Sequence, residues 1–480
     1  MQYITTRGEA GPLNASGAIL RGLADDGGLY VPESFPRINN LQYLTGLSYS
    51  DLAYEILRLF LTDYTDGEIR ACCDAAYGKK DEKFDTPAIA PLVSGGGYHF
   101  LELFHGPTLA FKDMALSILP SLLTLAAKKH RIDQKVVILT ATSGDTGKAA
   151  LEGFANLPNI DIFVFYPHNG VSAMQQLQMT TQEGANTHVI AVRGNFDDAQ
   201  TGVKAIFNKN QFNDVYLTSA NSINIGRLLP QIVYYVYAYG QMVRARDIAF
   251  GSPINFTVPT GNFGNILACY YARQMGLPIK NLLCASNDNR VLYDFFVSGI
   301  YNKNREFFVT ASPSMDILVS SNLERLLFHM SDARETREAM SALSLVGKYD
   351  FLHEKSGFEA MFATRAESFF ALKRLFVQSG RIVDPHTAVA LAAYEKYAEQ
   401  TGDDTPNVII STASPFKFPE SVLNALEKPC DPDPFANIKT LREISGHYPR
   451  GIMELQAKKI RHTDACMPYE MEQRVRDALQ

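Results

Sequence analysis

One lysine of this chain stands where a cation is unusual. Lys112 follows the apolar residues Leu109, Ala110 and Phe111 in the turn-rich run 103–113 (LFHGPTLAFKD). Apolar neighbours disfavour the ammonium form, so a neutral, nucleophilic amine becomes available near neutral pH. Schiff-base chemistry with an aldehyde needs such an amine. The alternative is a lysine whose stem covers apolar surface while its head reaches water, and this stretch alone favours that alternative.

Two glycine-rich turns offer sites for anions. The first runs from Thr142 to Gly147 (TSGDTG) and the second from Gly261 to Asn265 (GNFGN). Each follows an apolar run and opens a helical pattern, so its backbone amides can hold a phosphate or carboxylate at the positive end of a helix. Two such turns suggest a ligand with two anionic ends. Tight turns that need glycine only for backbone geometry are an equally weighted alternative for either turn alone.

A third polar stretch, 221–227 (NSINIGR), lies at another transition from strand to helix. Arg227 can bind a phosphate through two parallel hydrogen bonds, beside the side chains of Asn221, Ser222 and Asn224. The alternative is that Asn and Ser cap the helix and that Arg227 is solvated.

The segments around these stretches alternate between two patterns. Buried strands are predicted over residues 136–141, 162–166, 188–192, 215–219, 254–258, 282–286 and 408–411. Helices are predicted between them over residues 146–154, 171–180, 196–209, 225–243 and 266–275. This alternation predicts an α/β fold in which parallel sheets are covered by helices on both faces. Ligands then bind beyond the carboxyl ends of the strands, where the polar turns lie.

The flanking regions show other patterns. Before residue 84, short strands and turns are mixed with helices, among them a helix over Ser50–Leu61 with Ser50 as its cap. From about residue 287 to 380 the alternation weakens, and helices are predicted over residues 318–330, 334–343 and 358–376. A further helix begins at Asp384-Pro385.

We therefore predict three regions. They are an N-terminal domain (1–84), a catalytic region of two lobes (85–426) with a helical insertion at about 287–380, and a C-terminal tail (427–480) packed on the surface.

Composition excludes several classes of protein. The 480 residues are 46% hydrophobic and carry a net charge of −6, which argues against a nucleic-acid binder. The six cysteines are scattered without metal-ligand spacing, so we expect no metal site, no disulfide framework and a reducing compartment. The N-terminus lacks the apolar core of a signal peptide, and the most apolar stretch, 114–127, is too short to span a bilayer. A cytoplasmic protein is expected.

Several motifs together resemble those of the threonine synthase family. They occupy residues 3–8, 26–32, 103–113, 142–147, 221–231, 261–265, 384–388 and 411–418. The resemblance extends from Met1 to about Phe418 with the motifs in family order, which is more specific than any one glycine turn. It implies a pyridoxal-5'-phosphate enzyme of fold type II, the tryptophan-synthase-β fold.

The resemblance also implies roles for residues near the cofactor. Lys112 matches the lysine that carries the cofactor and shuttles protons; Lys148, inside a helix without apolar enclosure, and Lys417, past a strand end, fit that role less well. The turn that cradles the cofactor phosphate is matched by Gly261, Asn262, Phe263, Gly264 and Asn265. Thr412 matches the residue facing the pyridine nitrogen, where a hydroxyl makes the ring a milder electron sink.

The substrate contacts are predicted in the other two stretches. Thr142, Ser143, Asp145 and Thr146 match the segment that receives the substrate carboxylate. Because two carboxylates repel, we expect the Asp145 side chain to turn away and cap the loop or the helix. For the substrate phosphate we propose Arg227 with Asn221, Ser222 and Asn224. Family members often carry His and Ala where this chain has Ser414 and Phe416, which leaves the wall near the cofactor ring undetermined.

The implied activity converts O-phospho-L-homoserine and water to L-threonine and phosphate, by β,γ-elimination and water addition on the bound cofactor. An alternative is a phospho-lyase that acts on O-phosphohomoserine or O-phosphothreonine and gives a 2-oxo acid. A non-enzymatic binding protein that inherited the fold is the third and least favoured interpretation. The expected partner is the small-molecule substrate, without nucleic acid or membrane, and the chain is expected to be a monomer or homodimer.

Overall fold

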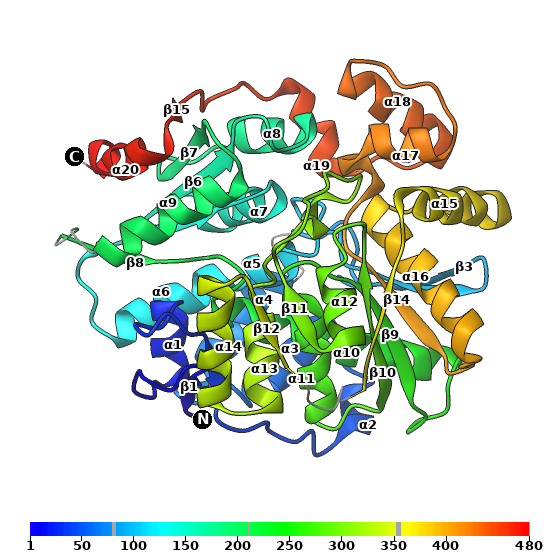
Figure 1. Ribbon diagram of the computed structural model, residues 1–480, viewed down its shortest axis with the longest axis horizontal. Helices are drawn as coiled ribbons and strands as arrows, with labels where there is room; N and C mark the ends of the chain where they lie inside the picture. Colours follow the sequence, from blue (N-terminus) through cyan, green and yellow to red (C-terminus); the bar gives the residue numbers. More distant parts are fainter. Residues whose placement is uncertain (79–82, 210–211, 213, 352–356, 480) are drawn as a thin grey trace.

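Two open α/β sheets form the frame of the protein (Figure 1). The computed structural model describes residues 1–78, 83–209, 212, 214–351 and 357–479. In the view of Figure 1 the smaller sheet lies at the upper left and the larger sheet at the right. The N-terminal and C-terminal segments pack against this frame.

The larger sheet has the strand order β13-β10-β9-β14-β4-β3. Its strands are β3 (Leu92–Gly95), β4 (Tyr98–Glu102), β9 (Ile254–Pro259), β10 (Ile279–Ser286), β13 (Phe358–Phe362) and β14 (Asn407–Ser411). All neighbouring pairs are parallel except the hairpin of β3 with β4. Helices α11 (Gly264–Gln274), α12 (Val291–Ser298) and α16 (Pro385–Thr401) are the main covering elements, and α10 (Ile225–Ala245) packs on α11.

The smaller sheet has the order β15-β7-β6-β5-β8 and all its pairs are parallel. Its strands are β5 (Lys135–Ala141), β6 (Ile160–Pro167), β7 (Thr187–Val192), β8 (Val215–Thr218) and β15 (Ala465–Cys466). Alternate residues of β5 serve opposite faces, as the two-residue strand period requires. Ile138 belongs to the apolar cluster that includes Leu151 of α7 (Asp145–Phe154), whereas Leu139 belongs to the cluster that includes Val203 of α9 (Phe196–Lys209).

The predicted alternation of strands and helices from residue 136 to 286 is confirmed, with α8 (Ala173–Thr180) completing the series. Two helix predictions need correction. The helix predicted over Ser50–Leu61 is α3 (Tyr49–Leu57), and its cap is Ser48, whose side chain accepts from the Asp51 N–H, so Ser50 lies inside the helix. The helix predicted over 358–376 begins as strand β13, and α15 (Arg365–Ser379) starts only after the capping box of Thr364 and Glu367.

The segment 287–380 is therefore not purely helical. Its helices are α12 (Val291–Ser298), the short 3-10 helix η2 (Pro313–Met315), α13 (Leu323–Met330), α14 (Ala333–Leu345) and α15. It also contains the antiparallel pair β11 (Ile300–Asn302) and β12 (Lys348–Asp350), and β13 extends the larger sheet beside β10. The short apolar run of β13 pairs in parallel with β10. Periodicity alone cannot distinguish such a short buried strand from a helical segment.

The N-terminal region contains β1 (Tyr3–Thr5), α1 (Ala15–Arg21), β2 (Tyr30–Pro32), α2 (Leu41–Leu44), α3 and α4 (Asp66–Tyr77), followed by α5 (Asp113–Leu116) and α6 (Leu119–Lys129). The buried Arg325 of α13 ties this region to the frame, because its Nε donates to the Tyr30 carbonyl at 2.9 Å and its Nη2 to the Ile223 carbonyl. Beyond residue 411 the elements are η3 (Pro415–Lys417), α17 (Pro419–Ala425), α18 (Pro434–Ser445), α19 (Arg450–Met453), η4 (Leu455–Ala457), β15, η5 (Pro468–Glu470) and α20 (Met471–Leu479). The C-terminal segment thus contributes strand β15 to the smaller sheet.

The strand order brings distant loops together. Strands β4, β14 and β9 are neighbours, so the segments that leave their carboxyl ends, 103–112, 412–417 and 260–265, meet at one edge of the larger sheet. Strands β5 and β8 are neighbours in the smaller sheet and deliver the turns 142–147 and 219–227.

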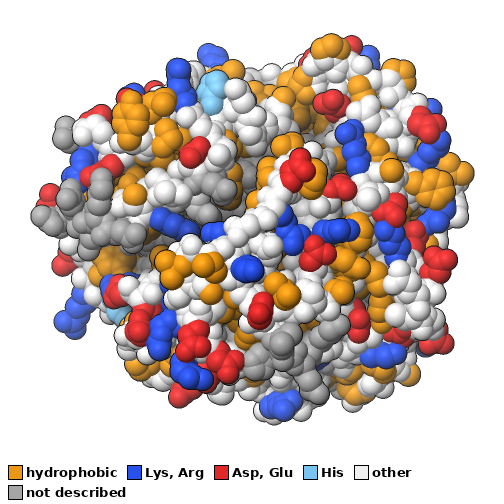
Figure 2. Space-filling view, viewed as in Figure 1, with side chains coloured by type: hydrophobic (Ala, Val, Ile, Leu, Met, Phe, Trp, Pro, Cys, Tyr) orange, Lys and Arg blue, Asp and Glu red, His pale blue; other side chains and the backbone are white. Residues whose placement is uncertain are grey.

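Two further observations concern partners. No helix in the described ranges is long and apolar enough to cross a bilayer. On the face seen in Figure 2, acidic and basic side chains are interspersed, unlike the one-sided basic surface that is typical of nucleic-acid binding.

Candidate active site

Lys112 stands at the start of α5 in a half-buried position, with its Nζ 3.8 Å from the centre of the Phe111 ring. Burial lowers the pKa of Lys112 to about 7; the carboxylate of Asp145 opposes this shift, and the cations Arg227 and Lys417 add to it. A pKa near 7 leaves much of the amine neutral under ordinary conditions. The predicted neutral nucleophile is therefore consistent with the surroundings of this lysine.

The backbone around Lys112 is fixed from two sides. Asp113 accepts from the Thr108 backbone N–H at 2.8 Å and from the Thr108 hydroxyl at 2.5 Å, which closes the turn before the lysine. The Phe111 N–H donates to the Thr412 carbonyl at 2.8 Å, so the Lys112 segment is tied to the segment that leaves β14. These bonds fix the position from which the Lys112 side chain starts.

Asp145 and Lys417 form a buried ion pair beside Lys112. The Lys417 Nζ donates to Asp145 Oδ1 at 2.9 Å and to the Thr108 carbonyl at 2.8 Å. Gln175 donates to the same carboxylate at 2.9 Å, and the Ser314 hydroxyl lies 3.3 Å from Oδ2. Burial opposes ionisation, but Lys417, Lys112 and these donors outweigh it and hold the pKa of Asp145 well below its usual 3.8.

This arrangement corrects the expectation for Asp145. Its side chain does not cap α7, whose N-cap is Gly144 and has no side-chain hydrogen bond. It turns instead toward Lys417, which neutralises the charge that would repel a substrate carboxylate.

The competing lysines differ from Lys112 in the partners of Nζ. Lys148 is buried, contrary to the expected lack of enclosure, and its Nζ donates to Glu152 at 2.8 Å and to Gln182. Lys417 is occupied by Asp145 and Thr108. Of these three lysines, Lys112 alone has no hydrogen bond from Nζ to another residue of the described ranges.

The turn 261–265 leaves β9 and opens α11. Phe263 adopts a left-handed conformation (φ 66°) at the N-cap, and no side chain caps the helix. Within the described residues, the backbone N–H groups of Asn262, Phe263, Gly264 and Asn265 have no hydrogen-bond acceptor. Several unpaired amides at a helix N-terminus can bind an anion. The phosphate contact of this turn stays a prediction.

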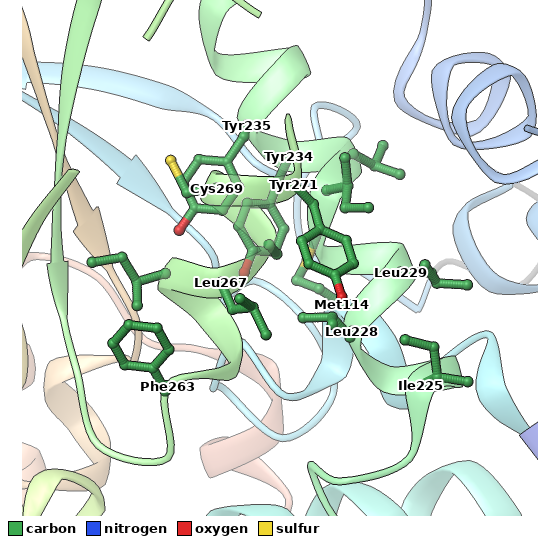
Figure 3. Packing of buried hydrophobic residues seen from close by; sticks show 14 of the residues in the cluster. Met114, Ile225, Leu228, Leu229, Tyr234, Tyr235, Phe263, Leu267, Cys269 and Tyr271 are labelled. Carbon is green, nitrogen blue, oxygen red and sulfur yellow. The ribbon is translucent and has the colours of Figure 1, made fainter. Parts of the chain in front are cut away.

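Contacts from behind hold the turn in place. The Ser320 hydroxyl donates to the Gly261 carbonyl at 2.7 Å, and Asn322 donates to the Asn262 carbonyl from its N–H and its side chain. A Cβ on Gly261 would collide with the Ser314 carbonyl, so the close approach requires glycine. Phe263 belongs to the apolar core drawn in Figure 3, and its ring packs against Phe296 of α12 (Val291–Ser298) and Phe358 of β13.

Asn265 adds a polar side chain behind this turn. Its Oδ1 accepts from the hydroxyls of Tyr234 and Tyr235, both at 2.6 Å. Its buried Nδ2 has no hydrogen-bond partner among the described residues.

The turn 142–147 leaves β5 and opens α7. The Thr142 hydroxyl accepts from the Gly144 and Gly147 N–H groups, both at 2.9 Å, so it shapes the turn. Ser143 and Thr146 are half-buried, and in the described chain their hydroxyls have no hydrogen bond. The structure therefore leaves Ser143 and Thr146, not Thr142, with hydroxyls available for a ligand.

The stretch 221–227 divides into binding and structural residues. Asn224 caps α10: its Oδ1 accepts from the Gly226 N–H, and its Nδ2 donates to the carbonyls of Ile19 and Ser219. All its hydrogen-bonding positions but one lone pair are taken, so the predicted phosphate contact from Asn224 is wrong and the capping alternative holds. Asn221 and Ser222 remain half-buried at the same end of the helix.

Arg227 is buried, contrary to the solvated alternative. Its Nη1 donates to the Ala220 carbonyl at 3.1 Å, while its Nε has no partner among the described residues. Burial lowers the pKa of Arg227 to about 10, which leaves it charged at neutral pH. A buried guanidinium with an unpaired N–H is a strong site for an anion.

A network that the sequence did not reveal supports the site from the larger sheet. Asp384 caps α16 and accepts from His386 Nδ1 at 2.8 Å, and His386 Nε2 accepts from the Ser314 N–H at 3.1 Å. Ser314 therefore links His386 to Asp145 across the two lobes. Its segment lies in 287–380, for which no site was predicted from the sequence.

The segment after β14 completes the site. Thr412 is buried, and in the described residues its hydroxyl has no hydrogen bond. Ser414 accepts from the Phe416 N–H at 3.3 Å, and Phe416 packs against His447 and Tyr448 of the C-terminal segment. Phe416 thus joins the C-terminal segment to this edge of the sheet.

These residues fit pyridoxal phosphate. The free backbone amides of 262–265, in a turn that requires glycine at position 261, suit its phosphate. The neutral amine of Lys112 suits its aldehyde, and the Thr412 hydroxyl suits its ring nitrogen. No group of three or more His, Cys, Asp or Glu side chains in the described ranges could hold a metal ion.

Three family models match the chain: Threonine synthase N terminus over residues 2–77, Pyridoxal-phosphate dependent enzyme over 86–413 and Threonine synthase, C-terminal over 387–457. Threonine synthase of Pseudomonas aeruginosa is 39% identical over 98% of this chain and 100% of its own length. The Saccharomyces cerevisiae threonine synthase is 34% identical over 94% and 95%. The crystal structure of pyridoxal-phosphate-bound threonine synthase from Brucella melitensis is 36% identical, with a TM-score of 0.87 over 100% of this chain and 99% of that one.

Proposed function

The chain belongs to the threonine synthase family of pyridoxal-phosphate-dependent enzymes, and from this premise we propose that it converts O-phospho-L-homoserine and water to L-threonine and phosphate. The observation that carries the proposal is that Asp145 and Arg227 each lie within electrostatic reach of Lys112. One amine, one neutralised carboxylate and one buried guanidinium suit a substrate that is both an amino acid and a phosphate ester.

The cofactor is held by residues of the larger sheet. The turn Gly261-Asn262-Phe263-Gly264-Asn265 would bind its phosphate through the unpaired backbone amides. Lys112 would hold the cofactor, and Thr412 would offer a neutral hydroxyl to its ring nitrogen. When bound, pyridoxal phosphate supplies an electron sink for negative charge that develops beside the substrate α-carbon.

Lys112 also moves the protons of the reaction. With a pKa of about 7, its Nζ can take a proton from the substrate and return it without a large energetic penalty in either direction. Lys417 and Asp145 form an ion pair beside Lys112, and their effects on the Lys112 amine oppose each other.

The substrate carboxylate binds at the N-terminus of α7. The backbone amides of Asp145 and Thr146 and the hydroxyls of Ser143 and Thr146 are its donors, with Thr142 shaping the turn. The substrate phosphate binds Arg227, whose Nε lacks a partner among the described residues, together with Asn221 and Ser222. Asn224 takes part only as the helix cap.

The product of the reaction tests the proposal. The holoenzyme is supplied with O-phospho-L-homoserine, and threonine, 2-oxobutyrate and phosphate are quantified. Threonine and phosphate in equal amounts are expected. Predominant 2-oxobutyrate with ammonia would assign the phospho-lyase activity instead, because both reactions release phosphate but only the synthase adds water at Cβ and keeps the amino group.

The location, the domain division and the assembly of the chain also belong to this proposal. All six cysteines are free thiols, which supports a cytoplasmic location. We retain the division into residues 1–84, 85–426 and 427–480, and a monomer or homodimer as the assembly.

A further inference from the structure

A cavity of about 370 Å³ lies beside the segment 106–113 that carries Lys112. Gly106, Pro107 and Asp113, which flank Lys112 in the sequence, line it, but Lys112 itself does not. None of the residues proposed above for cofactor or substrate lines it, as far as the described ranges extend. The cavity is therefore separate from the catalytic site and shares one wall segment with it.

Its walls come from the catalytic region and from the C-terminal segment. α7 contributes Lys148 and Glu152, α8 contributes Gln178, and the C-terminal elements α19 and η4 contribute Arg450 and Leu455. The volume suits a small ligand of amino-acid size with a few waters, since ligand pockets usually begin at about 300 Å³.

The charges of the walls are balanced. The charged lining residues are Lys83, Lys148, Arg450 and Lys458 against Asp85, Asp113, Glu152 and Glu454. Lys148 is paired with Glu152 at 2.8 Å, and Arg450 lies 3.2 Å from Asp85. Such a balance gives no net attraction for a polyanion or a polycation, but it provides partners for both ends of a zwitterion.

One buried side-chain oxygen of the cavity lining, on Gln178, is available to a ligand. Gln178 is 2% exposed, and its Oε1 has no hydrogen-bond partner among the described residues. Buried side-chain oxygens are usually hydrogen-bonded. Because Oε1 is an acceptor, an N–H group of a ligand in the cavity could pair with it.

We propose that this cavity binds a free zwitterionic α-amino acid. Its ammonium group lies toward the carboxylates of Asp113 and Glu152, its carboxylate lies toward Lys458, and the Gln178 amide completes the contacts. The ligand also touches Gly106 and Pro107, so its binding is coupled to the segment that positions Lys112.

Direct binding to the holoenzyme tests the proposal, with the free proteinogenic α-amino acids as probes in isothermal titration calorimetry. At least one should bind, and Gln178→Leu, which removes the amide at nearly constant volume, should weaken its affinity by about tenfold or more. Gln176→Leu is the matched control, because Gln176 is an exposed residue of the same helix and does not line the cavity. Lys458→Glu changes an exposed residue at the cavity and should weaken binding as well.

Three results would overturn the proposal. The first is that no amino acid binds. The second is equal affinity of wild type and Gln178→Leu, which would assign the ligand to the catalytic site. The third is that acetate or methylamine binds as tightly as the amino acid. The readout is binding rather than turnover, so its failure leaves the proposed reaction untouched.

Discussion

Replacing Lys417 with methionine tests the buried ion pair. Both side chains are almost fully buried, and Lys417 makes two hydrogen bonds, to Asp145 at 2.9 Å and to Thr108 at 2.8 Å. Removing one partner of a buried pair costs about 3–5 kcal/mol, because the remaining charge is uncompensated. Gln175 and Ser314 still bond the carboxylate in the variant, so we expect the lower end, about 3 kcal/mol.

The assay is denaturant unfolding followed by circular dichroism, since the chain contains no tryptophan. Lys373→Met is the matched control: Lys373 pairs with Glu427 at 2.5 Å with side chains 40% and 72% exposed, so a change below about 0.5 kcal/mol is expected. The double variant Asp145→Asn/Lys417→Met should recover about 2 kcal/mol of the loss, because it removes the orphaned charge.

The same variant has a defined effect on acidity. Lys417 lowers the pKa of Lys112 and Asp145 raises it, so deleting Lys417 should move the pKa of Lys112 upward from about 7. Stability should also change with pH. The wild-type pKa of Asp145 lies below 3.8, so the ionised pair stabilises the fold above that pH and is lost only in acid, whereas Lys417→Met lacks this contribution. Equal stability of Lys417→Met and wild type, unaffected by Asp145→Asn, would refute this reasoning.

Four further predictions follow from the site. Lys112→Ala should lower turnover roughly 10³-fold or more and abolish the borohydride-trapped adduct with pyridoxal phosphate, whereas Lys148→Met should keep the adduct; trapping on another lysine would contradict this. The rate of trapping on apoenzyme should rise with pH around about 7, the pKa of Lys112, and a midpoint near 10.5 would contradict its shielding. Gly261→Ala should cost about 1–3 kcal/mol by collision with Ser314 and weaken cofactor affinity in equilibrium dialysis; unchanged affinity would argue against the cradle. Arg227→Lys should raise KM for O-phosphohomoserine about tenfold or more with a smaller effect on kcat, because it loses the planar fork; unchanged KM would remove Arg227 from the phosphate site.

Local patterns were sufficient for the frame of the site. The alternation of apolar runs and helical periods predicted the strands that carry the turns 142–147 and 261–265, because burial and backbone conformation repeat with a short period. The glycine at position 261 and the apolar residues before Lys112 could also be identified, because both are properties of the local sequence. The start of α15 was missed although Thr364 and Glu367 form a capping box, a pattern that could have placed it.

The pairing of distant side chains was beyond those patterns. β14 lies between β4 and β9 although it follows them by more than a hundred residues, so no local spacing indicates that Lys417 meets Asp145. For the same reason Ser314 could not be placed beside His386, and the use of Asn224 as a cap depended on carbonyls of Ile19 and Ser219.

The sequence by itself thus determined the chemistry that is possible here: one lysine in apolar surroundings, and glycine turns at strand ends that can bind anions. Only the tertiary structure decided which of Lys112, Lys148 and Lys417 is left without a hydrogen-bonding partner in the described ranges. It also decided that the Asp145 carboxylate is neutralised by Lys417. The physical reason is that burial and charge pairing depend on neighbours in space, and the order of the strands in the sheets sets those neighbours.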